Sequence, residues 1–255
     1  MSSSIWMQCE GASRRQLLQV VPWRVVESQH RVSTRKLVDS AAEQELLEAL
    51  VDGLKPPAVA GPRLHYLLST PFRYPPLRHG SRFGARTERG LWYGALLPRT
   101  AFAEVAYYRL LFLAGSHASL GLVMTELSAF TVRMRSAAGV HLDARPFRAH
   151  RAAISSPVSY AASQALGRAM RDAGVELFLY ASARDAEAGL NVGAFTPAVF
   201  RSAKPQHFQR WQCTATPAVV EFVRRDLSGE RERYEFAHAP FLVAGVLPAP
   251  GVSCS

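Results

Sequence analysis

The sequence is poor in cysteine, with only Cys9, Cys213 and Cys254 spread over 255 residues. Their number is odd, and no two are spaced as in a zinc site or a disulfide framework. The eight histidines are dispersed between His30 and His238, without the close pairs that bind a metal ion. We therefore expect no metal site, and free thiols that suit the reducing cytoplasm.

Long apolar runs are also missing. The longest, around Leu110–Ala114, is far shorter than the stretch of about 20 residues that spans a bilayer. Residues 1–10 have neither a basic segment nor a long apolar segment, so they make a poor secretory signal. We expect a cytoplasmic protein without a membrane partner.

Several common enzyme signatures are absent from the chain. There is no G-x-G-x-x-G, no Walker A sequence, no G-x-S-x-G, no H-E-x-x-H and no set of kinase motifs. These absences remove the main support for a Rossmann dehydrogenase, a P-loop nucleotidase, an α/β-hydrolase, a zinc peptidase and a kinase.

What the chain does have is an apolar content of 48% and an excess of positive charge, with 30 Lys and Arg against 20 Asp and Glu. The apolar content is sufficient for one large domain with a substantial core. The formal charge of +10 favours anionic partners such as nucleotides, nucleic acid, acidic proteins or anionic membranes. The arginines are scattered and form no continuous basic arm, so charge alone does not choose among these partners.

The first 58 residues are interpreted as a prefix to the main domain. Residues 1–20 show no clear periodicity and are predicted to be a loosely held lead-in. Ser40 and Glu43 have the spacing of a capping box, which predicts a helix that ends near Gly53. A Pro-rich connector to Pro62 follows. We predict a prefix over 1–58, which could pack on the core or on a second subunit, and a domain over 59–255.

The rest of the chain alternates between two helical segments and several strands. A helix over 101–113 capped by Thr100 would place Glu104 in or near its first turn. A second helix over 159–173 would stop at Gly174. Strand-like patterns occur at 130–135, 175–180, 191–195, 219–223, 233–236 and 241–246. Because most of these strands lack intervening helices, we predict an α+β fold with largely antiparallel sheet and flanking helices.

Three closely spaced segments carry the most specific pattern. They are Phe-Arg-Tyr-Pro-Pro-Leu-Arg-His-Gly-Ser-Arg-Phe-Gly at 72–84, Leu-Trp-Tyr-Gly at 91–94 and Thr-Ala-Phe-Ala-Glu-Val-Ala at 100–106. Together they resemble the RES domain, a family named for its Arg, Glu and Ser. The family residues match Arg82, Tyr93 and Glu104 at equal steps of eleven residues.

The family serine matches Ser182, in a Tyr-Ala-Ser-Ala-Arg segment at 180–184 that resembles the family's Tyr-Pro-Ser-x-Arg. Ala181 departs from this pattern, since a proline is common there. Arg73 and Tyr74 resemble an Arg-Tyr pair that the family places upstream. The resemblance runs from about residue 24 to residue 200, and the prefix at 30–39 is similar to that of a longer subclass.

The resemblance implies a fold related to the ADP-ribosyltransferases and a toxin that destroys NAD⁺, which is the substrate, without a further cofactor. It also implies a neighbouring Xre-type antitoxin that blocks the site, with a homodimer expected within the toxin–antitoxin complex. On this basis we predict that Glu104, Arg82, Tyr93 and Ser182 are catalytic. The predicted NAD⁺-binding residues are Arg82, Tyr93, Ser182, Arg73 and Tyr74.

The chemistry gives each of the four a distinct role. Cleavage of the bond between ribose and nicotinamide passes through an oxocarbenium-like state, which the Glu104 carboxylate would stabilise. Nicotinamide leaves as a neutral molecule, so no general acid is needed. Arg82 offers a planar fork for the pyrophosphate, Tyr93 a ring for stacking, and Ser182 a hydroxyl that orients nicotinamide or ribose.

Two other functions remain open at this point. The first is ADP-ribosyl transfer to a cellular protein, which cleaves the same bond and differs only in the acceptor. The second is a non-enzymatic, basic module that binds nucleic acid through its arginine-rich loops. No recognised DNA-reading or RNA-reading motif is present, so we do not expect the toxin alone to bind nucleic acid.

Overall fold

The computed structural model of the chain describes residues 4–28, 63–74, 80–116, 120–225, 229 and 231–249. The predicted helix before Gly53, the connector that ends at Pro62 and Cys254 lie outside these residues. The same holds for the predicted boundary at residues 58 and 59, so the division into two parts stays a prediction.

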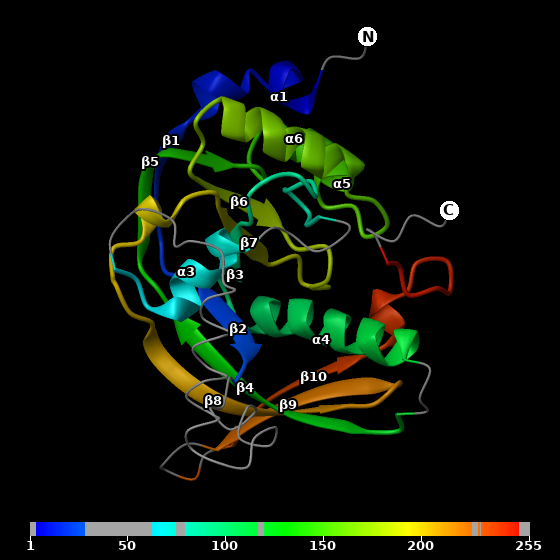
Figure 1. The fold of residues 1–255 in the computed structure, drawn as a ribbon. Coiled ribbons are helices and arrows are strands. Elements are labelled where there is room, and N and C mark those ends of the chain that lie inside the picture. Colours follow the sequence, from blue (N-terminus) through cyan, green and yellow to red (C-terminus); the bar gives the residue numbers. More distant parts are fainter. Residues whose placement is uncertain are drawn as a thin grey trace.

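A single sheet of ten strands organises the described part of the chain (Figure 1). The strands are β1 Gln16–Val20, β2 Trp23–Glu27, β3 Trp92–Ala95, β4 Val123–Thr131, β5 Met134–His141, β6 Leu177–Ala181, β7 Leu190–Ala194, β8 Gln206–Ala215, β9 Val219–Arg225 and β10 Arg231–Ala237. Their order is β1-β5-β6-β7-β3-β2-β4-β8-β9-β10. Each neighbouring pair is antiparallel except β5 and β6, which are parallel. The predicted α+β class is therefore confirmed.

The sheet nearly divides in two between β3 and β2. These strands are paired at one position, Trp23 with Ala95, whereas β2 pairs with β4 along its whole length. Just beyond that position the Arg24 side chain replaces the missing strand pairing, because its Nη1 donates to the Tyr93 carbonyl at 2.9 Å. The strands diverge here, and side chains from both halves can reach the same space.

Helices cover the two halves of the sheet separately (Figure 1). The α-helices are α1 Ile5–Gln8, α3 Tyr66–Arg73, α4 Pro98–Gly115, α5 Arg151–Ile154 and α6 Ala161–Asp172. The short 3₁₀ helices are Gly11–Arg14, Phe147–His150, Pro197–Val199 and Ala239–Phe241. Helix α4 packs on the half that contains β2, β8, β9 and β10, whereas α1, α5 and α6 lie over the other half.

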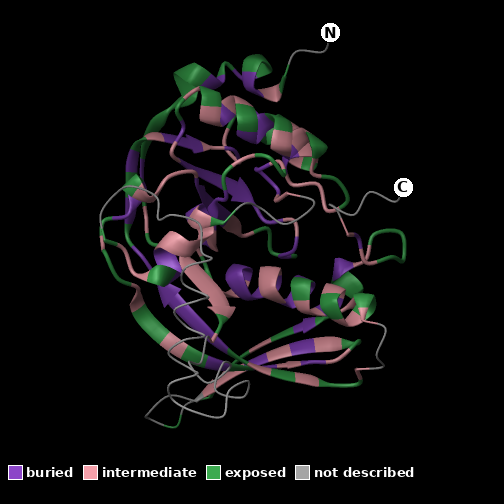
Figure 2. Cartoon of the chain, viewed as in Figure 1, coloured by how far each residue is buried: buried purple, intermediate pink, exposed green. Residues whose placement is uncertain are grey.

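Three clusters of buried apolar residues fill these interfaces, and the ribbon segments that hold buried residues are purple in Figure 2. One lies between α4 and the β8–β10 strands and is built around Phe102, Trp211 and Phe222. The second surrounds Trp92 and lies beneath α3, and the third joins α1 and α6 to β6. Helix α4 and strand β6 belong to different clusters.

The helix that carries Glu104 begins earlier than predicted. Its N-cap is Leu97 and Pro98 is its first residue, in keeping with the fixed φ of proline at that position. Thr100 therefore lies inside the helix and does not cap it. Glu104 lies in the second turn rather than in or near the first, where the helix dipole has little effect on a carboxylate because that effect fades beyond the first turn.

Of three further sequence predictions, two were right in type and the third was wrong. The 130–135 segment contains the end of β4 and the start of β5, with a break between them. The 159–173 helix is confirmed as α6, and Gly174 follows it with a φ of 71°, as expected for a C-terminal stop. Residues 241–246 form an isolated bridge between Val243 and Val246 rather than a strand.

The prediction of a loosely held lead-in over residues 1–20 was wrong. Strand β1 pairs with β5, and Trp6 and Cys9 are buried in the cluster beneath α6. Cys9 and Cys213 are both free and buried. Burial raises the pKa of the Cys213 thiol to about 11, so this thiol is a weak nucleophile at neutral pH. Within the described residues, no helix has the length and apolar character needed to cross a membrane.

Candidate active site

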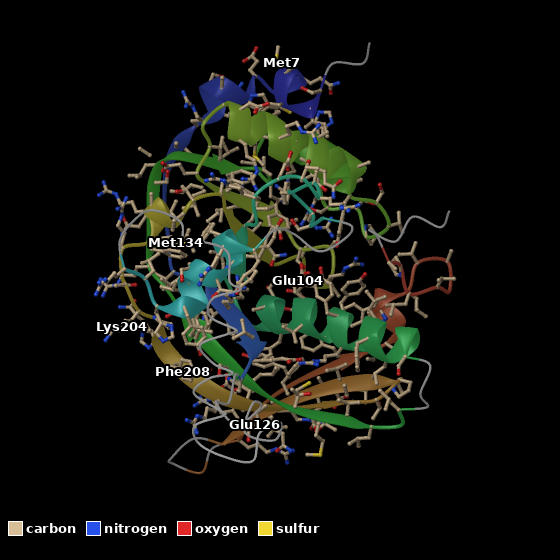
Figure 3. All side chains as sticks on the ribbon, in the orientation of Figure 1. Met7, Glu104, Glu126, Met134, Lys204 and Phe208 are labelled. Carbon is tan, nitrogen blue, oxygen red and sulfur yellow. The ribbon has the colours of Figure 1, made fainter. Side chains whose placement is uncertain are left out.

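A pocket of about 230 Å³ lies where the sheet divides, between α4 and the strands of the other half. Figure 3 places Glu104 near the centre of the molecule, on the end of α4 that faces this division. The described residues that line the pocket are Trp23, Arg24, Val25, Ser81, Arg82, Tyr93, Gly94, Ala101, Glu104, Val105, Tyr108, Tyr160, Tyr180 and Asn191. Three of the four predicted catalytic residues are thus brought together on its wall.

The Glu104 carboxylate is held by one of its two oxygens. Oε1 accepts a hydrogen bond from Ser182 Oγ at 2.7 Å and another from Asn191 Nδ2 at 2.6 Å. Among the described residues nothing donates to Oε2. The two donors therefore fix the carboxylate and leave Oε2 available to a ligand in the pocket.

Ser182 lies behind Glu104 rather than on the described pocket wall. Its Oγ accepts from the backbone N–H groups of Arg184 and Asp185, each at 3.1 Å, and donates its only proton to Glu104. A hydroxyl has one proton and two lone pairs, so its hydrogen-bonding capacity is fully used. This arrangement supports a positioning role for Ser182 instead of the predicted contact with nicotinamide or ribose.

The loop that carries Ser182 is tied to the start of α4. Thr100 Oγ1 donates to Asp185 Oδ2 at 2.7 Å, and both side chains are buried. The loop closes on itself through the Ser182 N–H, which donates to the Gly189 carbonyl at 2.8 Å. A Cβ on Gly189 would lie 2.0 Å from Thr100 Oγ1. The loop thus holds Ser182 and Glu104 in fixed relative positions, and it has no room for a larger residue at Gly189.

Arg82 is 7% exposed and stacks over the Tyr160 ring, with 4.8 Å between Cζ and the ring centroid. Its Nη1 donates to the Ser156 carbonyl at 2.8 Å and to the Ile154 carbonyl at 3.5 Å. Its Nε and Nη2 have no hydrogen-bond partner among the described residues. One edge of the guanidinium therefore holds the 154–156 segment, and no described residue occupies the other donors.

Arg24 is a second guanidinium on the pocket wall, and the sequence did not single it out. It stacks over the Trp92 ring, 5.1 Å from the centroid, and its buried Nε lacks a partner in the described part of the chain. Burial lowers the pKa of Arg24 to about 10. Neither Arg24 nor Arg82 forms an ion pair with a described carboxylate, so the pocket contains positive charge that is not compensated by an ion pair.

Aromatic rings supply most of the remaining wall. Tyr93 is turned with its hydroxyl away from the sheet, because Oη accepts from the Phe83 N–H at 3.1 Å and lies 3.0 Å from Ser81 Oγ. Tyr108, Tyr160 and Tyr180 line the same space. Flat rings of this kind can stack on aromatic heterocycles, so the described wall offers four tyrosines as candidates for such a contact.

Burial raises the pKa of Tyr93 to about 12. The unfolded chain loses this proton near pH 10, whereas the folded chain keeps it. We therefore expect the free energy of unfolding to fall as the pH rises from 10 to 12, with a slope of at most about 1.4 kcal/mol per pH unit from this residue. Urea denaturation of the wild type and of Tyr93→Phe at pH 8, 10 and 11 should show a shallower decline in the variant. Equal slopes would contradict the assigned burial.

The structure does not bring Arg73 and Tyr74 to the pocket. Arg73 is the last residue of α3 and Tyr74 its C-cap, and neither is among the described lining residues. Residues 75–79, which follow them, lie outside the described part of the chain. The predicted role of Arg73 and Tyr74 in binding NAD⁺ therefore stays a prediction.

Asn191 and Arg24 are the functional candidates that sequence reasoning missed. A signal was present for each, because both are polar residues within apolar strand segments, Trp-Arg-Val-Val at 23–26 and Leu-Asn-Val-Gly-Ala at 190–194. Polar groups in buried strands need a partner. Only the strand order, which is not evident from the sequence, brings both residues to the wall of this pocket.

Comparison with known proteins supports the family resemblance that the sequence motifs indicate. The family model for the RES domain matches residues 55–215, which is more than half of the chain and includes Arg82, Tyr93, Glu104 and Ser182. No curated protein matches the chain significantly.

Proposed function

The chain belongs to the RES-domain family, and we propose that it is the toxin of a toxin–antitoxin pair and depletes NAD⁺ by cleaving the nicotinamide–ribose bond. Family membership indicates a toxin-like function connected with NAD⁺. The observation that carries the finer proposal is the Glu104 carboxylate, fixed through one oxygen on the wall of a tyrosine-rich pocket with two guanidiniums.

The reaction needs a negative charge beside the sugar. When the bond between ribose C1′ and the nicotinamide nitrogen breaks, the electron pair moves to the ring and neutralises it, while positive charge develops at C1′. Glu104 Oε2 is placed to stabilise that charge, since Oε1 is held from behind by Ser182 and Asn191. An acceptor then bonds to C1′ and completes the cleavage, either phosphate or a water molecule that gives up a proton to solvent.

The charges of the pocket fit a dinucleotide. The pyrophosphate of NAD⁺ carries two negative charges, and Arg24 and Arg82 offer two guanidiniums without a described carboxylate partner. Guanidinium donors match phosphate oxygens well in geometry. The tyrosine rings offer surfaces on which nicotinamide or adenine could stack, which supports a dinucleotide as the ligand.

We expect purified protein to convert NAD⁺ labelled in its adenylate part into free ADP-ribose or its phosphorylated form. Chromatography of the small molecules, with and without added phosphate, measures this and identifies the acceptor. Label retained on a protein band would instead favour ADP-ribosyl transfer, which uses the same bond cleavage. Unchanged NAD⁺ over hours, together with salt-sensitive binding of nucleic acid, would contradict the proposal.

In cells we propose that an Xre-type antitoxin binds this protein in the cytoplasm and keeps it inactive, within a complex that contains a toxin homodimer. Induction of the chain alone should lower cellular NAD⁺ within minutes, before growth stops. Co-expression of the adjacent antitoxin gene should prevent that fall. A growth arrest that precedes any loss of NAD⁺ would show that the toxin acts on another target.

A further inference from the structure

Asn191 is the only asparagine in the 255-residue sequence, and it occupies an unusual place in the fold. It lies in β7 between Ala95 of β3 and Tyr180 of β6, in the half of the sheet opposite α4. Its side chain is 2% exposed and crosses to Glu104. The 2.6 Å bond from Nδ2 to Oε1 therefore links the two sides of the pocket.

The other end of the same side chain is unpaired. Asn191 Oδ1 is buried and accepts no hydrogen bond from the described residues. An unpaired buried carbonyl oxygen costs stability, so an apolar residue would suit this strand better as far as folding is concerned. The amide is thus poorly explained by stability and well explained by what its nitrogen does for Glu104.

We propose that Asn191 is a positioning residue that, together with Ser182, holds Glu104 Oε1 and turns Oε2 toward the bound substrate. Its amide is suited to this because it donates without carrying a charge. Ser182 directly follows β6 and Asn191 lies in the neighbouring strand β7, and the loop after Ser182 is tied to α4 through the bond between Asp185 and Thr100. Two donors from different elements restrict the rotation of the carboxylate more than either one does alone. This inference rests on the proposed function.

An electrically neutral donor matters because the surroundings of Glu104 are already charged or titratable. Arg24 of β2 and Arg82 lie on the pocket wall, as do Tyr93, Tyr108, Tyr160 and Tyr180. Tyr107 of α4 and the buried pair Arg184 and Asp185 lie close behind. An additional carboxylate at position 191 would stand within hydrogen-bond distance of Glu104, and the two would compete for one proton.

The first test reads the hydrogen bond without any enzymatic assay. Because Asn191 is the only asparagine, protein labelled with ¹⁵N-asparagine gives one side-chain amide pair in an NMR spectrum. We expect Glu104→Gln to shift that pair, and Glu126→Gln, on an exposed part of β4, to leave it in place. An unchanged pair in Glu104→Gln would overturn the contact, whether or not the protein cleaves NAD⁺.

The second test uses Asn191→Asp, which keeps the shape and adds a negative charge. We expect NAD⁺ turnover at pH 7 to fall at least tenfold and the acid limb of the pH–rate profile to move up by about one pH unit or more, because Glu104 must now share a proton. A purely structural role for Asn191 would lower the amount of folded protein without moving the profile. An unmoved profile in a folded variant would contradict the proposal.

Asn191→Leu separates positioning from folding. Removal of the unpaired buried oxygen should leave the melting temperature unchanged or raise it, while kcat falls about tenfold or more and KM changes less. A lower melting temperature together with an unchanged kcat per folded protein would show that Asn191 supports the fold only. If the wild type leaves NAD⁺ intact, the proposed function fails, and the NMR test still decides the Asn191–Glu104 contact.

Discussion

Glu104→Gln is expected to lower NAD⁺ turnover by roughly two to three orders of magnitude and to relieve toxicity, while the protein folds normally. The glutamine amide has nearly the same shape, and its oxygen can still accept from Ser182 and Asn191. What it lacks is the negative charge on the second oxygen, which the oxocarbenium requires. The size of the loss follows from the removal of a preorganised electrostatic contact to the transition state.

Glu126→Gln is the matched control for this experiment. Glu126 is exposed on β4 and is not among the described residues that line the pocket, Figure 3 labels it on a different element from Glu104, and the substitution removes the same charge from the protein. The two variants should be compared by NAD⁺ consumed per folded protein, with folding checked by circular dichroism and thermal denaturation. Full turnover by Glu104→Gln would remove Glu104 from the mechanism, whereas equal losses in both variants would indicate a general charge effect.

The central part of the fold and of the site could be predicted from sequence because the signals there are local. The apolar periodicity of α6 and its terminal glycine fix one helix, and the eleven-residue steps that connect Arg82, Tyr93 and Glu104 carry the family pattern. These features depend on neighbours in sequence. The strand order and the division between β3 and β2 depend on contacts between distant segments, and no local pattern encodes them.

The misplaced predictions show the same limit in physical terms. Thr100 is a good N-cap residue in isolation, but the Pro98 ring starts the helix earlier and Asp185 takes the Thr100 hydroxyl. Ser182 was assigned to the substrate because it matches the family serine and its hydroxyl can donate a hydrogen bond. Its two backbone donors come from the turn at Arg184 and Asp185, and only the folded loop reveals that no donor is left.

Arg82→Lys is the second substitution for which we expect a large effect, although lysine keeps the positive charge. The guanidinium performs two tasks at once, because Nη1 holds the Ser156 carbonyl while the plane stacks on Tyr160. Its remaining donors are left for the pyrophosphate. A lysine ammonium is a compact point charge that cannot hold a carbonyl, stack on a ring and bind a phosphate together.

Because hydrogen bonds to charged groups contribute about 1.5–3 kcal/mol, the loss of one to the pyrophosphate should raise KM about tenfold to a hundredfold. Arg135→Lys, at an exposed position of β5, should have little effect on the same assay. Thermal denaturation of both variants separates weaker binding from a weakened 154–156 segment, since ADP-ribose should stabilise wild type and Arg135→Lys but not Arg82→Lys. Equal KM values for the two variants would show that Arg82 only supports the fold and would leave Arg24 as the cation that meets the pyrophosphate.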